Sequence, residues 1–254
     1  MILSIMPVQE LLTIREVATM FGVSMDTLRR WDKRGYFPAL KKGPGGHRFY
    51  PKQQVETYMR DIFTEAKKWV MGELDLQDIP YDQYCENSGV FQARLANFQQ
   101  ELDSLKELEE MYPLILAIVG EIGNNSFDHN LGNWPGDVGI FFAHDLVRGY
   151  VALADKGQGI LQTLNRVRPD LISHADALRV AFTEVITGRS PEKRGNGLKF
   201  VKKVVQAEPM ELSFYSGDAM VQIKTARDDI NITVTGFEFQ GCLALLKFYT
   251  DKQL

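Results

Sequence analysis

The sequence predicts an α+β protein with a small helical N-terminal domain, a helical connector and a C-terminal domain of helices and strands. The first 60 residues are basic and contain two short segments of helical periodicity followed by a glycine- and proline-rich stretch. The middle of the chain has apolar residues at helical spacing, and the last 40 residues alternate between apolar and polar residues as strands do. We therefore expect domains at 1–60, 61–112 and 113–254.

Composition indicates a soluble protein that can bury a core. Hydrophobic residues make up 44% of the 254 residues and charged residues 24%, and no apolar run approaches the roughly 20 residues that span a bilayer. The N-terminus lacks the basic segment of a secretory signal. Cys85 and Cys242 are the only cysteines, too few for a disulfide framework. We expect a cytoplasmic protein without a membrane partner.

Charge is divided unevenly along the chain. Residues 1–60 hold ten Lys/Arg and five Asp/Glu, a net +5, whereas residues 61–254 hold 19 basic and 28 acidic residues, a net −9. A basic segment attached to an acidic body predicts that the first segment binds a polyanion and the second does not.

The basic segment has the pattern of a helix-turn-helix. Apolar residues between Leu12 and Phe21 follow helical spacing, Gly22 ends that helix, and Ser24 caps a second one. Such a motif lays its second helix in the major groove of double-stranded DNA. The outward face of that helix carries Thr27, Arg29, Arg30, Lys33 and Arg34. The next stretch, KKGPGGHRFYP, cannot be helical and fits a basic wing over phosphates.

Residues 11–59 resemble the winged helix-turn-helix of the MerR/excisionase superfamily, with helix, turn and PGGHRFY wing in order. The resemblance implies that the second helix reads bases and that Arg48 and Tyr50 hold the DNA backbone. The alternative is a small basic helical domain that binds protein instead.

The connector is predicted to be helical. Residues 52–70 form one expected helix, and the helix at 88–111 has apolar residues near a 3.5-residue period. These residues are Phe91, Leu95, Phe98, Leu102, Leu105 and Tyr112. Such a seam can pair with a second helix, and we expect a homodimer. The alternative is a helix that packs on its own domain.

A polar decamer, EIGNNSFDHN, follows an apolar run on a helix expected from Pro113 to His129. Glu121 and Asn125 lie four residues apart and therefore share one face of this helix. Asparagine supplies a hard oxygen to Mg²⁺, and a glutamate can orient or deprotonate a water. The alternative is a solvated polar stripe.

Two glycine motifs follow in order. The segments DVGIFFAHD and GYVALAD are expected strands, and the second runs into a D-x-G-x-G motif of Asp155, Gly157 and Gly159. A carboxylate at a strand end can accept from an exocyclic amine, and glycine lets the backbone approach a ligand closely. Gly195 and Gly197 then precede a helix whose N–H groups can receive phosphate.

These motifs resemble the GHKL ATPase superfamily over residues 113–250. The resemblance implies a Bergerat-type α/β sandwich with a mixed sheet that binds ATP and Mg²⁺. Asn125 would bind the metal, Glu121 would position the attacking nucleophile or water, and Asp155 would hold the adenine amine. Gly157 and Gly159 would open the adenine pocket. Residues 160–194 would form a lid, and the expected phosphate contacts are Lys193, Arg194, Gly195 and Gly197.

Three functions remain open on the sequence. The helix at 88–111 holds no histidine that could accept a phosphoryl group, which argues against a sensor histidine kinase. The favoured hypothesis is a DNA-binding regulator gated by ATP–Mg²⁺, with slow hydrolysis as an option. The first alternative is an anti-sigma-like serine/threonine kinase that phosphorylates a separate STAS-type partner. The second is an excisionase-like architectural protein with a degenerate nucleotide fold.

Overall fold

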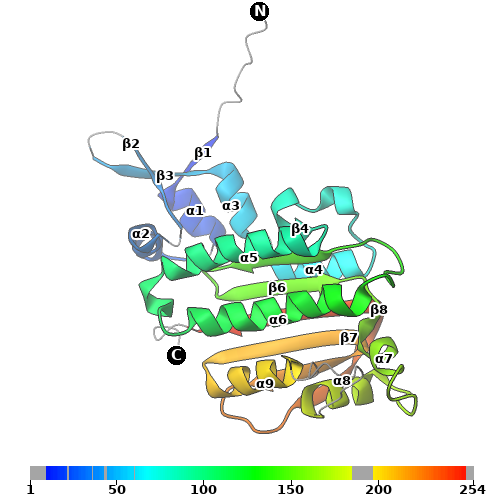
Figure 1. Cartoon of the computed structure of the whole chain (residues 1–254). Helices are drawn as coiled ribbons and strands as arrows, with labels where there is room; N and C mark the ends of the chain where they lie inside the picture. Colours follow the sequence, from blue (N-terminus) through cyan, green and yellow to red (C-terminus); the bar gives the residue numbers. More distant parts are fainter. Residues whose placement is uncertain are drawn as a thin grey trace, which may run out of the picture. The chain divides into compact units, whose positions relative to one another are not determined.

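The computed structural model describes residues 10–21, 23–35, 37–42, 45–59, 61–184 and 197–249. The chain divides into two compact units, which are described separately: unit 1, Met1–Asp61, and unit 2, Ile62–Leu254. Figure 1 labels their helices and strands.

Unit 1 is a small helical domain with a three-stranded antiparallel sheet of order β1-β3-β2. Its elements are β1 (Leu11–Thr13), α1 (Ile14–Phe21), α2 (Met25–Arg34), β2 (Leu40–Lys42), β3 (His47–Pro51) and α3 (Lys52–Met59). Its core includes Val17, Leu28, Phe37, Tyr50 and Val55. The stretch expected to be an irregular wing is instead a strand pair, because Leu40 lies opposite Phe49 in a regular ladder.

Helix α2 has well-defined ends. The Ser24 hydroxyl accepts from the Thr27 N–H at 3.0 Å, which satisfies one of the donors that a helix N-terminus leaves unpaired. Gly35 ends the helix with a φ of 79°, a left-handed conformation that glycine adopts without steric cost. Both ends of the predicted second helix are thus fixed by local chemistry.

The single helix expected at 52–70 is wrong, because the structure has two helices there. α3 ends at Met59 and belongs to unit 1, whereas α4 (Ile62–Val70) begins unit 2. Val55 is buried in the unit 1 core, while Ile62 and Ala66 are buried in a unit 2 cluster. The two helices are separate because the apolar residues of α3 pack in the core of unit 1 and those of α4 pack in the core of unit 2.

Unit 2 contains a five-stranded sheet of order β4-β5-β6-β8-β7. Its remaining elements are η1 (Leu76–Asp78), η2 (Tyr81–Gln83), β4 (Tyr84–Cys85), α5 (Ser88–Asp103), η3 (Lys106–Leu108), α6 (Tyr112–Asn130), β5 (Ile140–Asp145), β6 (Tyr150–Asp155), α7 (Gly159–Leu164), α8 (His174–Thr183), α9 (Gly197–Ala207), β7 (Met210–Lys224) and β8 (Asn231–Phe248). Every described strand pair is antiparallel. The expected mixed sheet is therefore wrong, while the α+β class is confirmed.

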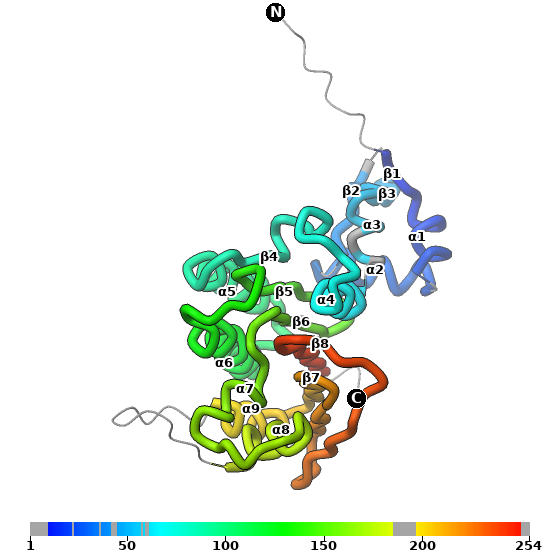
Figure 2. The backbone as a smooth tube through the Cα atoms, turned by 90° about the vertical axis from the view of Figure 1, so that its right-hand side faces the viewer, coloured from blue at the N-terminus to red at the C-terminus, as the bar shows by residue number. Residues whose placement is uncertain are grey.

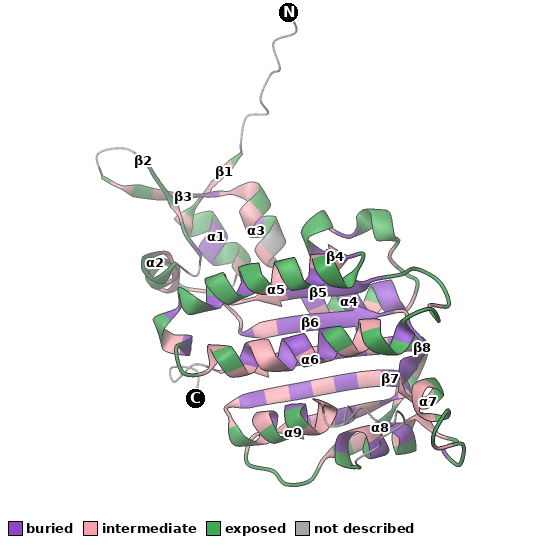
Figure 3. Cartoon of the chain, viewed as in Figure 1, coloured by how far each residue is buried: buried purple, intermediate pink, exposed green. Residues whose placement is uncertain are grey.

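Helices cover both faces of this sheet. Figures 1 and 2 show α5 and α6 side by side on one face and α4 on the opposite face. The central strands β5 and β6 are buried along most of their length, as Figure 3 shows. The strands between these helices are therefore the core of the unit.

The apolar seam of α5 is used inside unit 2. Phe91, Phe98 and Leu102 are fully buried, and the Phe91 and Phe98 rings contact Phe142 of β5 edge-on. The helix also contacts α6 through Gln92. Because its apolar side chains are already covered, this face is not open to a second helix, and the packing alternative describes it.

The C-terminal residues that alternate as strands do form two long strands, β7 and β8. β7 pairs with β8 from Met210 opposite Phe248 to Gln222 opposite Asn231, with an irregularity around Gly217. The irregularity bends the pair without ending it.

No helix among the described residues is both long and apolar enough to cross a bilayer.

Candidate functional site

The solvent face of α2 carries the basic residues that the sequence predicts. Arg29, Arg30, Lys33 and Arg34 are all exposed. Thr27 is half-buried and belongs to the helix cap, because its hydroxyl lies 2.9 Å from the Ser24 hydroxyl and accepts from Arg30 Nη2 at 3.3 Å. Thr27 therefore holds the start of α2 and positions Arg30.

A basic hollow of about 450 Å³ lies between α2 and the β2–β3 strand pair. It is lined by Asp26, Arg29, Arg30, Lys33, Lys41 and Arg48. The single acid, Asp26, is paired with Arg29. A concave surface with five cations and one neutralised acid attracts anions such as phosphate.

Tyr50 does not lie on this surface, and the expectation that it holds the DNA backbone is wrong. Its side chain is fully buried and stacks on Phe37 with ring centroids 5.2 Å apart. Burial, with the nearby Asp32 carboxylate, raises the pKa of the Tyr50 hydroxyl to about 12. Arg48, two residues before Tyr50, is the β3 side chain that lines the hollow.

In unit 2, α6 forms one wall of the second candidate site. Pro113 begins the helix where a missing N–H costs nothing, and Ile115, Ile118 and Ile122 bury its apolar side. Glu121 and Asn125 lie on the other side, and Asn125 Nδ2 donates to Glu121 Oε1 at 3.1 Å. The predicted pair therefore forms, with the amide oxygen of Asn125 directed away from the glutamate.

Asp155 ends β6 in a buried polar niche. Only 2% of its surface is exposed. Oδ2 accepts from the Ser126 hydroxyl at 2.7 Å, and Oδ1 accepts from Gly157 N at 2.8 Å and from Asn130 Nδ2 at 3.4 Å. The Cys242 N–H donates to the same carboxylate. These four donors come from α6, from the loop after β6 and from β8.

Burial dominates the acidity of this group. Removal from water raises the pKa of Asp155 from 3.8 to about 6, although all four donors act to lower it. At neutral pH the carboxylate is ionised and is held by hydrogen bonds. The neighbouring Cys242 thiol has a pKa raised well above 9 by burial and by the Asp155 charge, so it stays protonated.

The D-x-G-x-G glycines bring the backbone close to these groups. A Cβ atom at Gly157 would lie 1.9 Å from Asn130 Nδ2, so a side chain there would displace Asn130. Gly159 begins α7 with a φ of 76°, next to Ser216 and Gly241. The two glycines thus allow α6, β7 and β8 to meet at the end of β6.

The start of α9 lies directly against Glu121. A Cβ atom at Gly197 would come 1.5 Å from Glu121 Oε1. Gly197 at the start of α9 and Asp155 at the end of β6 therefore both contact α6, at Glu121 and at Ser126. Lys193, Arg194 and Gly195 are outside the described residues, as is the last part of the expected lid, residues 185–194.

Sequence reasoning missed Ser126 and Asn130 as parts of the niche. Asn130 is buried; its Nδ2 donates to the Ser126 carbonyl at 2.8 Å, and its Oδ1 accepts from Gln158 N at 2.8 Å. The spacing of four residues that singled out Glu121 and Asn125 also relates Ser126 to Asn130. That second stripe was the available signal.

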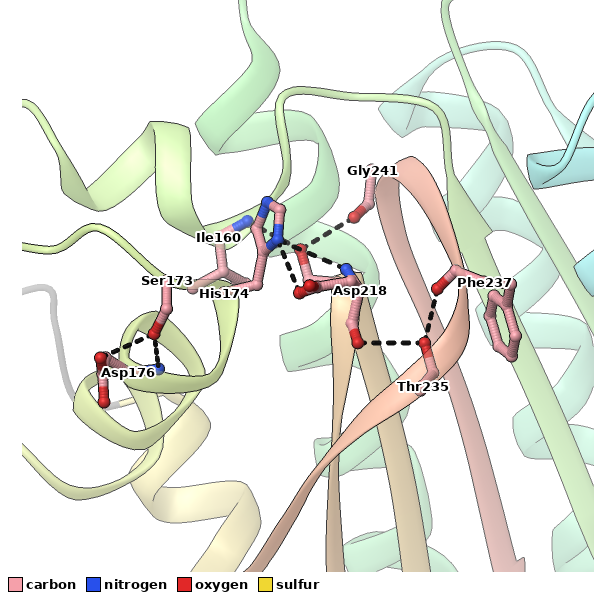
Figure 4. Close-up of polar contacts among 9 residues, drawn as sticks. Ile160, Ser173, His174, Asp176, Asp218, Thr235, Phe237 and Gly241 are labelled. Atoms are coloured by element: carbon pink, nitrogen blue, oxygen red, sulfur yellow. Dashed lines mark hydrogen bonds and ion pairs between the residues drawn. The ribbon is translucent and has the colours of Figure 1, made fainter.

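A second hollow, of about 560 Å³, lies beside α7 and the bulge of β7 and β8. His174 is one of its lining residues, and Figure 4 shows it beside Asp218, with Nδ1 2.9 Å from Asp218 Oδ1. The Ser216 hydroxyl donates to the Gly241 carbonyl at 3.0 Å and accepts from Ile160 N at 3.0 Å. These bonds tie α7 and α8 to the strands, so His174 has a structural partner.

Comparison with known proteins identifies the N-terminal part of the chain. Residues 13–50 match the family profile described as MerR family regulatory protein, and this segment is a MerR-family helix-turn-helix domain, a DNA-binding class. The type II methyltransferase M.Eco47II of Escherichia coli is 34% identical over 61 residues. That match spans 24% of this chain and 15% of the methyltransferase.

A comparison of structures finds an ATP-binding domain. It is the topoisomerase IV ATP-binding domain of Francisella tularensis, in complex with a small-molecule inhibitor. The match covers 60% of this chain and 42% of that one, at 14% identity and a TM-score of 0.32.

Proposed function

We propose that the protein is a DNA-binding regulator whose unit 2 binds ATP with Mg²⁺, and that the nucleotide changes DNA affinity or assembly. The observation that supports the nucleotide part is that α6 contacts two other predicted motifs: Gly197 lies against Glu121, and Asp155 accepts from Ser126. The DNA part rests on the helix-turn-helix at residues 13–50 and its basic hollow.

The Asp155 niche fits an adenine amine under one condition. A carboxylate has about four lone-pair directions, and four donors already occupy this one. Two of them are backbone N–H groups, and Asn130 is fixed by further hydrogen bonds. The Ser126 hydroxyl can rotate, and it is half-buried whereas Asp155 is not exposed. An adenine amine would therefore take the place of the Ser126 donor at Oδ2.

The residues near Glu121 fit magnesium held mainly by phosphate. Asn125 keeps its Oδ1 as a hard oxygen ligand because Nδ2 is engaged by Glu121. Within the described residues there is no group of three His, Cys, Asp or Glu side chains around one point. Mg²⁺ commonly takes one or two protein oxygens, with phosphates and water supplying the rest. Such a metal would neutralise phosphate charge, and the α9 N-terminus would offer N–H groups to the same anion.

Nucleotide binding is tested by calorimetry and thermal unfolding of the full chain with ATP and Mg²⁺. At a concentration of ~100 times the dissociation constant, a ligand of the folded state adds about 2.7 kcal/mol of stability. We expect this shift in the wild type and its loss in Asp155→Asn, which places an amide donor against the adenine amine. No binding heat in the wild type would refute the nucleotide part.

Coupling is tested by fluorescence anisotropy of labelled duplex DNA with and without ATP–Mg²⁺. Allosteric coupling is typically five- to 150-fold, and an affinity unaffected by nucleotide would refute the regulatory part. Arg30→Ala should weaken DNA binding and leave nucleotide binding intact, while Asp155→Asn should do the reverse.

Turnover is a separate question, which Glu121→Gln addresses. The amide is isosteric but cannot accept a proton, so this variant should bind ATP and lose phosphate release. It should equally lose transfer to a serine/threonine hydroxyl of a STAS-type partner. Wild-type turnover in Glu121→Gln would remove Glu121 from the chemistry.

A further inference from the structure

An acidic side chain lies beneath the basic hollow of unit 1, where DNA would be expected to repel it. Asp32 is on α2, and only 4% of its side chain is exposed. Its two oxygens accept from two parts of the wing. Oδ1 accepts from Ala39 N at 3.0 Å, immediately before β2, and Oδ2 accepts from Arg48 Nε of β3 at 2.5 Å.

Lys41 completes this arrangement. Its Nζ lies 3.4 Å from the same Oδ2. The buried Asp32 carboxylate therefore pairs with one cation from β2 and one from β3. Burial alone would raise the pKa of Asp32, but the Ala39 N–H, Arg48 and Lys41 together lower it. The acid is therefore ionised at neutral pH and attached to the wing.

Both cations also line the hollow. Arg48 uses Nε for Asp32, and a guanidinium has four further N–H donors. Arg48 is a quarter exposed and Lys41 about half exposed. The contact with Asp32 therefore fixes the Nε side of the Arg48 guanidinium and the Lys41 ammonium, and both residues line the hollow.

We propose that Asp32 is a positioning residue for DNA binding, which holds Arg48 and Lys41 so that they receive a backbone phosphate in the hollow. The proposal rests on the DNA-binding part of the proposed function. It predicts the opposite sign from simple electrostatics, because removing an acid beside a polyanion would otherwise tighten binding.

The test is Asp32→Asn in the full chain, with a short random-sequence duplex as the probe. Asparagine can still accept from Ala39 N through its oxygen, but its amide nitrogen faces Arg48 Nε, so only the cations are released. We expect roughly tenfold weaker binding, as for a lost hydrogen bond to a charged group. The slope of log K against log salt should fall by about one, the value for one lost phosphate contact.

A double-mutant cycle separates positioning from loss of stability. In a Lys41→Met/Arg48→Met background both cations are already gone, so Asp32→Asn should tighten binding, a reversal of sign that a folding defect would not produce. Tighter or unchanged binding by Asp32→Asn alone would overturn the proposal. Failure of the wild type to bind duplex would instead refute the proposed function.

Arg48→Lys serves if Asp32→Asn does not fold. It keeps the net charge but loses the Nε donor that meets Asp32, and a lysine cannot reproduce the planar guanidinium contact. We expect weaker binding at equal charge, and wild-type affinity in this variant would overturn the proposal.

Discussion

Asp155→Asn should change how the stability of the protein depends on pH. The folded-state pKa of Asp155 is about 6 and its ordinary value is 3.8. Between these values the folded protein binds more protons than the unfolded chain, so this group makes the protein less stable as pH rises through that window. A gap of about two pKa units corresponds to about 3 kcal/mol. Above pH 6 the wild type carries this full penalty of an ionised, buried carboxylate.

Asparagine removes the titrating group and keeps partners for three of the four donors, and the loss of the Cys242 hydrogen bond is the same at every pH. Its amide oxygen can accept from Gly157 N and Asn130 Nδ2, and its amide nitrogen can donate to the Ser126 hydroxyl oxygen. The difference in free energy of unfolding between Asp155→Asn and the wild type should therefore grow in favour of the variant by about 3 kcal/mol from pH 4 to pH 7.

The assay is urea unfolding of both proteins at intervals across this range. Contributions from other carboxylates, and from unit 1, are common to both proteins and cancel in the difference. Two stability curves that run parallel from pH 4 to pH 7 would refute the reasoning, because they would mean that the Asp155 pKa is not raised.

Three further substitutions test the packing of the two units. Gly157→Ala forces a methyl group against the buried Asn130 carboxamide and should cost about 1–3 kcal/mol of stability in thermal unfolding. The control is Gly236→Ala, where a Cβ meets nothing within 4 Å, and its stability should be within about 0.5 kcal/mol of the wild type. Equal effects of the two substitutions would contradict the close approach of Gly157 to Asn130. Tyr50→Phe removes a buried hydroxyl and should leave DNA affinity unchanged, so weaker binding by anisotropy would restore its predicted contact with DNA. Ser126→Ala removes a charge-assisted hydrogen bond to Asp155 and should cost about 1.5–3 kcal/mol of stability while tightening ATP binding in calorimetry, and weaker ATP binding would refute the displacement of its hydroxyl.

The presence and extent of a helix were predictable where apolar residues keep helical spacing over many residues. α6 runs from Tyr112 to Asn130, close to the expected helix, because its apolar residues keep helical spacing through five turns. The break between α3 and α4 was not predictable, since Val55, Ile62 and Ala66 stay in helical phase across it. Only the tertiary structure separates the two cores that these residues enter.

Two further features were not predictable from the sequence: the relative direction of neighbouring strands and the burial of individual side chains. Residue patterns show that β5 and β6 are strands but do not give their direction, so the mixed sheet came from resemblance alone. On β3, Arg48 and Tyr50 lie two residues apart, so strand alternation gives both the same side and does not show that Tyr50 is buried while Arg48 lines the hollow. Glu121, Asp155 and Gly197 were found because each belongs to a spaced motif, whereas Ser126 is an ordinary serine until β6 lies beside it.

Helix α4, the first element of unit 2, packs directly on the central strands of its sheet. This helix starts one residue after unit 1 ends, and its Ala66 packs in the same cluster as Ala152 and Ala154 of β6. Small side chains on both partners let helix and strand approach closely. A shift of the strand that ends at Asp155 would therefore displace α4, the first helix of unit 2.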